Sequence, residues 1–136
     1  MTEADEEIWC DERRTQVEAY LSHQGLAHGE IGDWPAWHVA PYVSIWAIES
    51  ISAPGWVGWW VICGDLPTDY CSADDCRHPR LALKKIADSW STALENFKLS
   101  DATIGTTALP ASLAPLLRTR TDLLAAMVAD QAAWQD

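Results

Sequence analysis

The chain has 136 residues, of which 49% are hydrophobic, and this length suits a single domain over residues 1–136 with its own buried core. Twenty acidic against nine basic side chains give a net charge of −11, which argues against nucleic-acid binding because no basic stripe can release counterions. The acidic N-terminus and the lack of any apolar run near ~18 residues exclude a secretory signal and a membrane helix, so we expect a cytoplasmic protein.

Residues 3–24 have the pattern of an amphipathic helix. Acidic side chains crowd its first turns, where the helix dipole stabilises negative charge. Gly25 is the expected end, because glycine readily adopts the left-handed conformation that terminates many helices. The apolar stripe consists of Ile8, Trp9, Val17, Tyr20 and Leu21. We expect Trp9 and Tyr20 to lie in the core.

Residues 25–41 lose this periodicity and contain three glycines and two prolines, which predicts a surface loop. The loop nevertheless carries Trp34 and Trp37. In one interpretation these side chains plug a face of the neighbouring hairpin, because tryptophan is mostly buried in proteins. In the other they form the rim of a binding site, where tryptophan is over-represented.

The most apolar stretch of the chain, residues 43–70, predicts two β-strands joined by a turn. Residues 43–50 alternate with a period of two and are rich in β-branched and aromatic side chains. The turn falls at residues 52–55, where Pro54 presets its own φ and Gly55 accepts a positive φ.

The register of this hairpin follows from a four-residue loop, which we favour over a tight two-residue turn because tight hairpins prefer mirror-image turn types. The expected opposite pairs are Ile51 with Trp56, Glu49 with Gly58, Ile48 with Trp59, Ala47 with Trp60 and Trp46 with Val61. Both faces of the ribbon are then apolar. A two-stranded ribbon of this kind is unstable alone, so helices or a partner must cover both faces.

Residues 64–78 predict an acidic loop that leads away from the second strand. Pro67 argues against further ladder pairing, because proline has no amide hydrogen to donate. Asp75 or His78 is the expected N-cap of the helix that opens at Pro79. The densest cluster of ionisable residues in the chain lies here and comprises Asp65, Asp69, Tyr70, Cys71, Asp74, Asp75, Cys76, His78 and Arg80.

This cluster admits three chemical interpretations and one structural one. A zinc site would use Cys63, Cys71, Cys76 and His78, but their spacing matches no paired zinc pattern. A cysteine nucleophile would need a lowered thiol pKa, which acidic neighbours oppose. Asp65 and Asp69 would serve as an acid–base pair, although aspartate is common in turns. In the structural interpretation, which we favour, the carboxylates and His78 satisfy backbone amides.

The rest of the chain predicts helices. Residues 79–97 carry one apolar stripe at helical spacing, and residues 98–110 predict a linker. Residues 111–134 predict a third helical region in two pieces, with Thr121 capping the second. We expect this C-terminal helix to cover a face of the hairpin. The four cysteines are expected to be reduced, as is usual in the cytosol.

A motif in the hairpin resembles a known family. Residues 56–70 have the form W-x-G-W-W-V-x-x-G-D-L-P-T-D-Y, followed by Ser72-Ala73-Asp74 and His78-Pro79-Arg80. They resemble an uncharacterised family of small bacterial proteins that is classed as a domain of unknown function. The similarity is specific over residues 43–97. It implies a bacterial, cytoplasmic protein and transfers no catalytic residue.

These observations predict an α+β fold in which an antiparallel β-hairpin, with room for a third short strand, is packed by three or four α-helices. For function we expect a protein-binding module, such as an immunity or antitoxin-like inhibitor that neutralises a basic bacterial effector. We expect no catalytic residue, metal or cofactor. The expected contact residues are Trp34, Trp37, Asp65, Asp69, Asp74 and Asp75. The alternatives are a small-molecule or metal-binding protein that uses the loop of residues 65–78, and a non-catalytic homo-oligomer.

Overall fold

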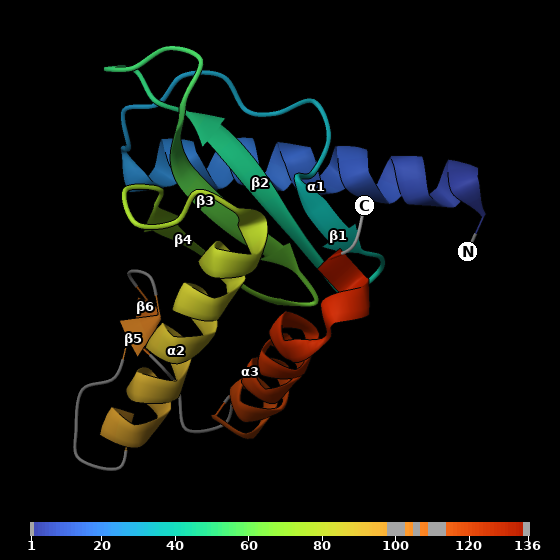
Figure 1. Ribbon diagram of the computed structural model, residues 1–136, viewed down its shortest axis with the longest axis vertical. Helices are drawn as coiled ribbons and strands as arrows, with labels where there is room; N and C mark the ends of the chain where they lie inside the picture. The colour runs from blue at the N-terminus through green and yellow to red at the C-terminus, as the bar shows by residue number, and fades with distance from the viewer. Residues whose placement is uncertain (1, 98–102, 105–106, 109–113, 135–136) are drawn as a thin grey trace.

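The computed structural model describes residues 2–97, 103–104, 107–108 and 114–134. Within them, helices pack on a four-stranded antiparallel sheet of strand order β1-β2-β3-β4 (Figure 1). The elements are α1 (Glu3–Gln24), β1 (Trp37–Val39), β2 (Val43–Glu49), β3 (Val57–Gly64), β4 (Leu66–Ser72), α2 (Pro79–Phe97), the short pair β5 (Thr103–Ile104) and β6 (Thr107–Ala108), α3 (Ala114–Ala129) and the 3-10 helix η2 (Gln131–Trp134). The predicted α+β class is confirmed, and the sheet is larger than the predicted hairpin.

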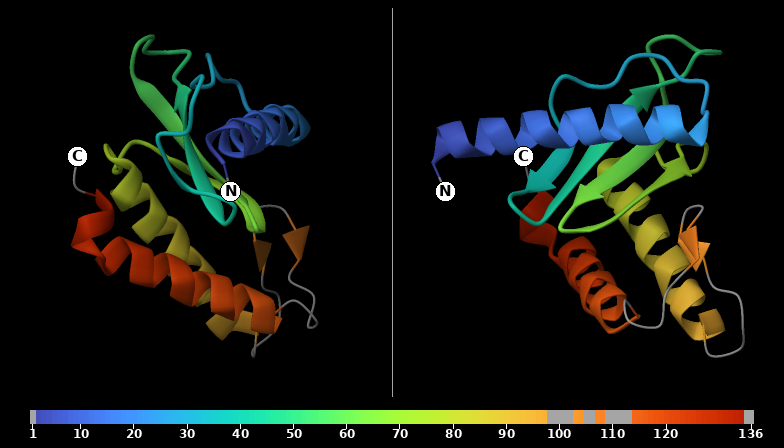
Figure 2. Two further views of the ribbon diagram at one scale, coloured as in Figure 1. Left: turned by 90° about the vertical axis from the view of Figure 1, so that its right-hand side faces the viewer. Right: turned by 180° about the vertical axis from the view of Figure 1, so that it is seen from behind.

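Helices cover both faces of the sheet, as the two apolar faces of the hairpin require. Figure 2 shows α1 across one face, with α2 and α3 on the other. On the α1 side, Trp46 and Val61 are fully buried with Val17 and Leu21 of the helix. On the other side, strand residues such as Ile45 are buried against α2 and α3. The alternation of β2 and β3 therefore builds two separate cores.

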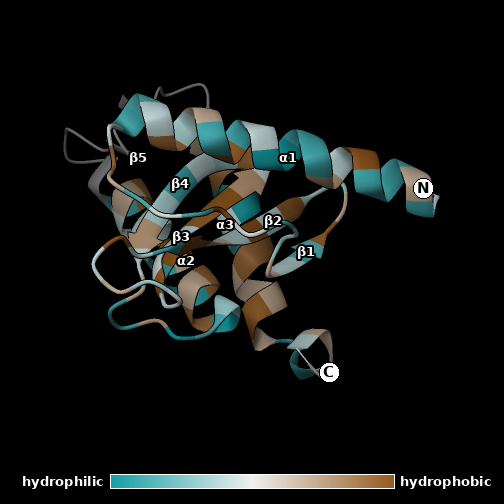
Figure 3. Cartoon of the chain, turned by 90° about the horizontal axis from the view of Figure 1, so that it is seen from above, coloured by the Kyte–Doolittle hydropathy of each residue, from teal (hydrophilic) through white to brown (hydrophobic). Residues whose placement is uncertain are grey.

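The helix α1 begins and ends where its sequence predicts. Thr2 and Asp5 form a capping box at its start, and Gly25 adopts the left-handed conformation at its end, with φ of 67°. The N-terminal end of α1 projects past the β1 edge of the sheet (Figures 1 and 2). Ile8 is 58% exposed and Trp9 is only half-buried, so the prediction that Trp9 lies in the core is wrong. Figure 3 shows how hydrophilic this helix is.

The hairpin register is confirmed in its central part, where Ala47 lies opposite Trp60 and Ile48 opposite Trp59. The predicted pair of Trp46 with Val61 is confirmed as well. Toward the turn the prediction is wrong, because a β-bulge places Glu49 opposite Val57 and leaves Gly58 as the extra residue. The next pair joins the amide of Ser50 to the carbonyl of Trp56, so the loop spans residues 51–55.

The segment predicted as an acidic loop is largely the strand β4, which pairs with β3 and forms an edge of the sheet. Pro67 fits there because an edge strand tolerates a residue without an amide hydrogen. A single residue, Asp65, separates β3 from β4. This abrupt reversal depends on Gly64, because its φ of 145° is a backbone conformation that residues other than glycine rarely adopt.

The loop predicted over residues 25–41 also contributes to the sheet. Strand β1 provides the third short strand that the sequence analysis allowed for, and it pairs with β2. Before it, the amides of Gly29 and Gly32 donate to the carbonyls of Glu49 and Ala47. The outer edge of β2 is thus largely occupied by residues 29–39.

The C-terminal region differs from its prediction. Helix α3 continues through Thr121, which donates its hydroxyl hydrogen to the Leu117 carbonyl at 2.8 Å rather than capping a new helix. The helix packs against α2 and β4. Of the predicted linker, residues 103–104 and 107–108 form β5 and β6, and residues 98–102, 105–106 and 109–110 lie outside the described residues. In the described part of the chain, no helix is long and apolar enough to cross a membrane.

Candidate functional site

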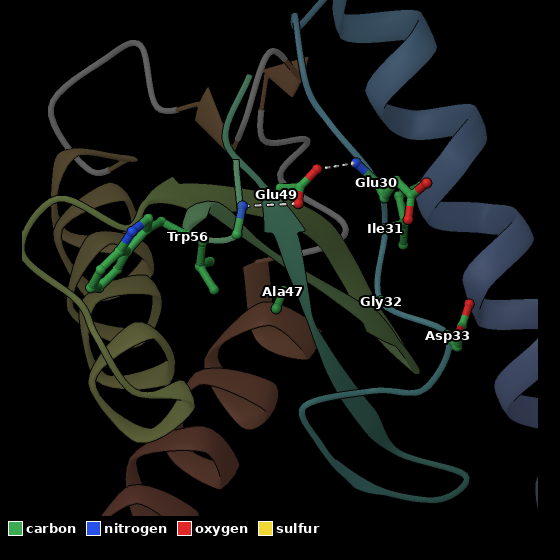
Figure 4. Close-up of a pocket in the computed structure, with 9 residues that line it drawn as sticks. Glu30, Ile31, Gly32, Asp33, Ala47, Glu49 and Trp56 are labelled. Atoms are coloured by element: carbon green, nitrogen blue, oxygen red, sulfur yellow. Dashed lines mark hydrogen bonds between the residues drawn. The ribbon is translucent and has the colours of Figure 1, made fainter. Parts of the chain in front are cut away.

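The hairpin end of the sheet is the part that α2 and α3 do not cover (Figures 1 and 4). Two hollows open there. We call the first, of about 260 Å³, the acidic hollow, because Glu30, Asp33 and Glu49 line it. We call the second, of about 570 Å³, the aromatic hollow, because Trp56 and Trp60 line it. The two hollows share Trp56 and Val57 as a common wall.

The β-bulge explains why this wall is exposed. A Cβ atom on Gly58 would lie 2.9 Å from the Cα atom of Ser50, so the two strands approach closely at the bulge. The residues beyond it are shifted by one position from the expected alternation. As a result the Trp56 side chain is 64% exposed, together with Ile51 at 58% and Val57 at 38%. The bulge therefore leaves large apolar side chains at the surface of the hairpin end.

Glu49 organises the acidic hollow. Its carboxylate accepts hydrogen bonds from the Gly55 amide at 3.0 Å and from the Glu30 amide at 3.5 Å, and so joins the hairpin turn to the loop before β1 (Figure 4). Glu30 and Asp33 are exposed, and within the described residues their carboxylates have neither a hydrogen bond nor an ion pair. Figure 4 shows both carboxylates on the α1 side of the loop, away from that of Glu49, and the Arg14 guanidinium of α1 donates to the Ile31 and Gly32 carbonyls between them at 3.0 Å.

The aromatic hollow lies on the other side of the shared wall. The Trp56 ring points away from Glu30 and Asp33 (Figure 4), and the Arg77 guanidinium lies 5.9 Å from its centroid. Trp60 is 3% exposed and donates its ring hydrogen to the Cys76 carbonyl at 2.7 Å, which fixes the ring in place. Arg77 and Asp74 are both exposed, and their opposite charges offset each other near this hollow.

Two of the predicted contact residues serve the fold. Asp65 forms an ion pair with Arg120 at 2.7 Å, which connects the β3–β4 reversal to α3. Asp69 is 7% exposed and accepts hydrogen bonds from the Trp90 ring at 2.9 Å and the Tyr70 amide at 2.8 Å. Burial raises the pKa of the Asp69 carboxyl above its usual value, and the two hydrogen bonds oppose this only in part.

The other predicted contact residues are dispersed. Trp37 stacks on Trp134 with ring centroids 4.3 Å apart, and its ring donates to the Ala133 carbonyl, so it anchors the C-terminal η2 helix. Trp34 is 46% exposed and lies edge-on to His38 beside β1, where it lines neither hollow. Asp74 and Asp75 are exposed, and Asp74 lines the aromatic hollow.

The sequence pattern does not predict the acidic hollow, Trp56 or Arg77 as parts of a site. It predicts instead that helices or a partner cover both faces of the hairpin along its whole length. One signal was present in the sequence. Trp56 directly follows the Pro54-Gly55 turn, and turn tips lie at the surface, so a tryptophan there was a candidate for exposure. The participation of Glu30 and Asp33 had no local signal, because they reach the hairpin only through pairing of residues 29–32 with β2.

The structure bears on two chemical interpretations of the ionisable cluster of residues 65–78, the zinc site and the cysteine nucleophile. Among the described residues, no three His, Cys, Asp or Glu side chains form a group suited to a metal ion. Burial raises the pKa of the Cys71 thiol to about 12, which disfavours a thiolate nucleophile. His78 accepts the Arg80 amide hydrogen at 3.1 Å and so caps α2, as one of the two predicted caps.

Comparison with known proteins gives a family and no activity. A family model described as Domain of unknown function (DUF4826) matches residues 3–134, well beyond the 43–97 range over which the resemblance was specific. No curated protein and no solved structure matches the chain.

Proposed function

Since the chain belongs to the Domain of unknown function (DUF4826) family, we propose from the hairpin end that it is a protein-binding module for a basic protein partner. Such a module would act as an immunity or antitoxin-like inhibitor, which binds a basic bacterial effector and neutralises it. The observation that carries it is the exposed Trp56–Val57 wall at the hairpin end of a chain whose net charge is −11.

The charge of the chain supports a basic partner. A net charge of −11 steers a positively charged protein toward the module and speeds their encounter. Among the residues that line the two hollows, the acids Glu30, Asp33, Glu49 and Asp74 outnumber the one base, Arg77, although the Arg14 guanidinium of α1 also lies on this loop. Affinity would come from the apolar wall, because exposed tryptophan and its surrounding rim are typical of binding hot spots.

The proposal is tested by capture and reconstitution. The wild-type chain and the Trp56→Ala variant are immobilised in parallel with lysate from the native host, and retained proteins are identified by mass spectrometry. We expect a basic protein that the wild type retains and the variant does not. After separate purification, the two proteins should bind with an affinity that falls steeply as salt rises, because exposed charges are screened.

The matched control is Trp34→Ala, which removes another exposed tryptophan away from both hollows and should leave capture unchanged. Equal retention by wild type and Trp56→Ala would contradict the proposal, as would a retained protein that binds no better than a generic basic protein such as lysozyme.

One observation favours a second candidate, a small-molecule-binding protein. The aromatic hollow, at about 570 Å³, lies within the ~300–1,000 Å³ range of ligand sites and combines apolar walls with Arg77. A screen of aromatic carboxylates by Trp56 fluorescence would separate this function from protein binding. A mass near twice that of the monomer in light scattering would instead favour the homo-oligomer.

A further inference from the structure

The aromatic hollow has the chemistry of a site for one class of small molecule, and we infer that it binds a free aromatic α-amino acid. The ring of this ligand packs against Trp56 and Trp60, its carboxylate meets the Arg77 guanidinium, and its ammonium group meets the Asp74 carboxylate. The inference rests on the second candidate function, small-molecule binding, and does not require a protein partner. It adds to that candidate the chemical class of the ligand.

Hydrogen bonds in the two walls keep the hollow open. On the hairpin side, the Ser50 amide donates to the Trp56 carbonyl at 2.8 Å, and the Trp56 amide donates to the Ala53 carbonyl at 3.1 Å. On the other side, the Ala73 amide donates to the Gly58 carbonyl at 3.0 Å, which ties the loop before α2 to β3. A ligand therefore enters a formed site, which limits the entropy lost on binding.

Two tryptophans make the hollow suited to an aromatic ring. Trp60 is 3% exposed, and the hydrogen bond from its ring to the Cys76 carbonyl at 2.7 Å fixes it as a rigid part of the lining. The Trp56 ring is 64% exposed and points away from Glu30 and Asp33 (Figure 4). Aromatic rings that pack offset or edge-to-face gain energy beyond the area that they bury. A ring in the hollow gains this from Trp56 and also covers its exposed face.

The lining of the hollow also carries one charge of each sign. Asp74 and Arg77 are both exposed, and within the described residues neither side chain forms a hydrogen bond or an ion pair. The Arg77 guanidinium lies 5.9 Å from the centroid of the Trp56 ring. The Asp74 amide donates to the Ser72 hydroxyl at 3.1 Å, so the backbone of this loop is fixed while the carboxylate is available to a ligand.

These two charges disfavour simpler ligands. A plain anion attracted by Arg77 would face the Asp74 carboxylate and the net charge of −11, and a plain cation attracted by Asp74 would face Arg77. A zwitterion offsets both side chains. An α-amino acid carries its ammonium and carboxylate on one carbon, and an aromatic one adds the ring that the tryptophans favour. The aromatic α-amino acid is therefore the simplest molecule that matches the ring and both charges.

The test is isothermal titration calorimetry of the full chain with four probes. L-Phenylalanine has the ring and both charges, 3-phenylpropionate lacks the ammonium group, phenethylamine lacks the carboxylate, and L-alanine lacks the ring. We expect L-phenylalanine to bind most tightly. Each probe that lacks one charge should bind about fivefold more weakly, which is the scale of an exposed ion pair, and L-alanine should bind about tenfold more weakly or worse.

Two protein variants assign each charge of the ligand to its side chain. Asp74→Asn should remove the preference for L-phenylalanine over 3-phenylpropionate and keep its preference over phenethylamine. Arg77→Gln should do the reverse, because a lost interaction appears as non-additivity in a double-mutant cycle. The matched controls are Asp75→Asn and Arg118→Gln, which change exposed residues outside the lining and should leave both preferences unchanged. Ala53→Trp, which fills the hollow without deleting a charge, should abolish binding of all four probes.

The outcomes separate this inference from the protein-binding function. Tight binding of 3-phenylpropionate or phenethylamine, equal to that of L-phenylalanine, overturns the inference. So does the absence of binding by every probe at millimolar concentration, or a wild-type pattern of preferences in Asp74→Asn and Arg77→Gln. None of these results alters the capture of a basic protein. If the capture experiment instead retains no basic protein, the protein partner is excluded and the affinities of the probes stand.

Discussion

Replacing Gly64 by alanine is expected to lower the free energy of unfolding by about 3 kcal/mol or more. Gly64 has a φ of 145° at the reversal from β3 to β4. An added Cβ atom would collide with the Tyr42 carbonyl oxygen and lie 3.1 Å from the Cα atom of Val43. These are backbone atoms of the paired strand, so they can yield only if the ladder shifts.

The same contact has a structural role that the substitution would damage. The Tyr42 carbonyl accepts the Asp65 amide hydrogen at 2.8 Å, and Val43 pairs with Gly64. The start of β2 is thereby tied to the β3–β4 reversal. Urea denaturation followed by tryptophan fluorescence measures the loss, because fully buried Trp46 and Trp90 report on the two cores.

The matched control for this prediction is Gly55→Ala. Gly55 also has a positive φ, of 89°, but a Cβ atom there would meet nothing within 4 Å. This variant has only the backbone strain of a positive φ, about 1–2 kcal/mol. If the two variants lose equal stability, the close approach of Gly64 to Tyr42 contributes nothing and the explanation is wrong.

Asp69→Ala is expected to lower the free energy of unfolding by about 2–4 kcal/mol at acidic pH, because two donors lose their acceptor. The Asp69 carboxylate binds the ring hydrogen of Trp90 and the amide of Tyr70. Trp90 is fully buried, so no water can replace the lost partner of its ring nitrogen. Denaturant unfolding of wild type and variant over a range of pH measures the effect.

The loss should also depend on pH with a definite sign. Burial raises the pKa of Asp69 above 3.8, so the folded state binds this proton more tightly than the unfolded state does. The contribution is therefore fully present below about 3.8 and declines as pH rises through the raised pKa. The stability difference between wild type and Asp69→Ala should be largest at acidic pH and shrink toward neutral pH.

Asp69→Asn provides the control for this titration. Its amide oxygen can accept one of the two hydrogen bonds, and the side chain carries no proton that titrates in this range. Its stability should consequently differ from that of Asp69→Ala by an amount that does not change with pH. A constant difference between wild type and both variants from pH 4 to neutrality would show that the Asp69 pKa is not raised.

Local chemistry in the sequence was sufficient for the helix ends and for the centre of the hairpin. Gly25 ends α1 and Pro79 opens α2 as predicted, because caps and proline act through their immediate neighbours. The central pairing of Ala47 with Trp60 follows from the alternation of the two strands. The same alternation predicted two apolar faces, and these required the helices that now cover them.

Features that depend on distant residues were decided only by the tertiary structure. Pro67 joins a strand because β4 is an edge, which its own sequence does not indicate. Thr121 lies within α3 because the whole helix packs against α2 and β4.

The candidate site belongs to the same class. Whether Trp56 is buried depends on how far α2 and α3 extend over the hairpin, and the bulge at Gly58 is set by the packing of three strands. Glu30 and Asp33 line the acidic hollow because residues 29–32 pair with the edge of β2. The sequence alone thus determined that the hairpin is apolar on both faces, because alternation is a local property. Which end of it stays uncovered was decided by long-range packing, which no local pattern encodes.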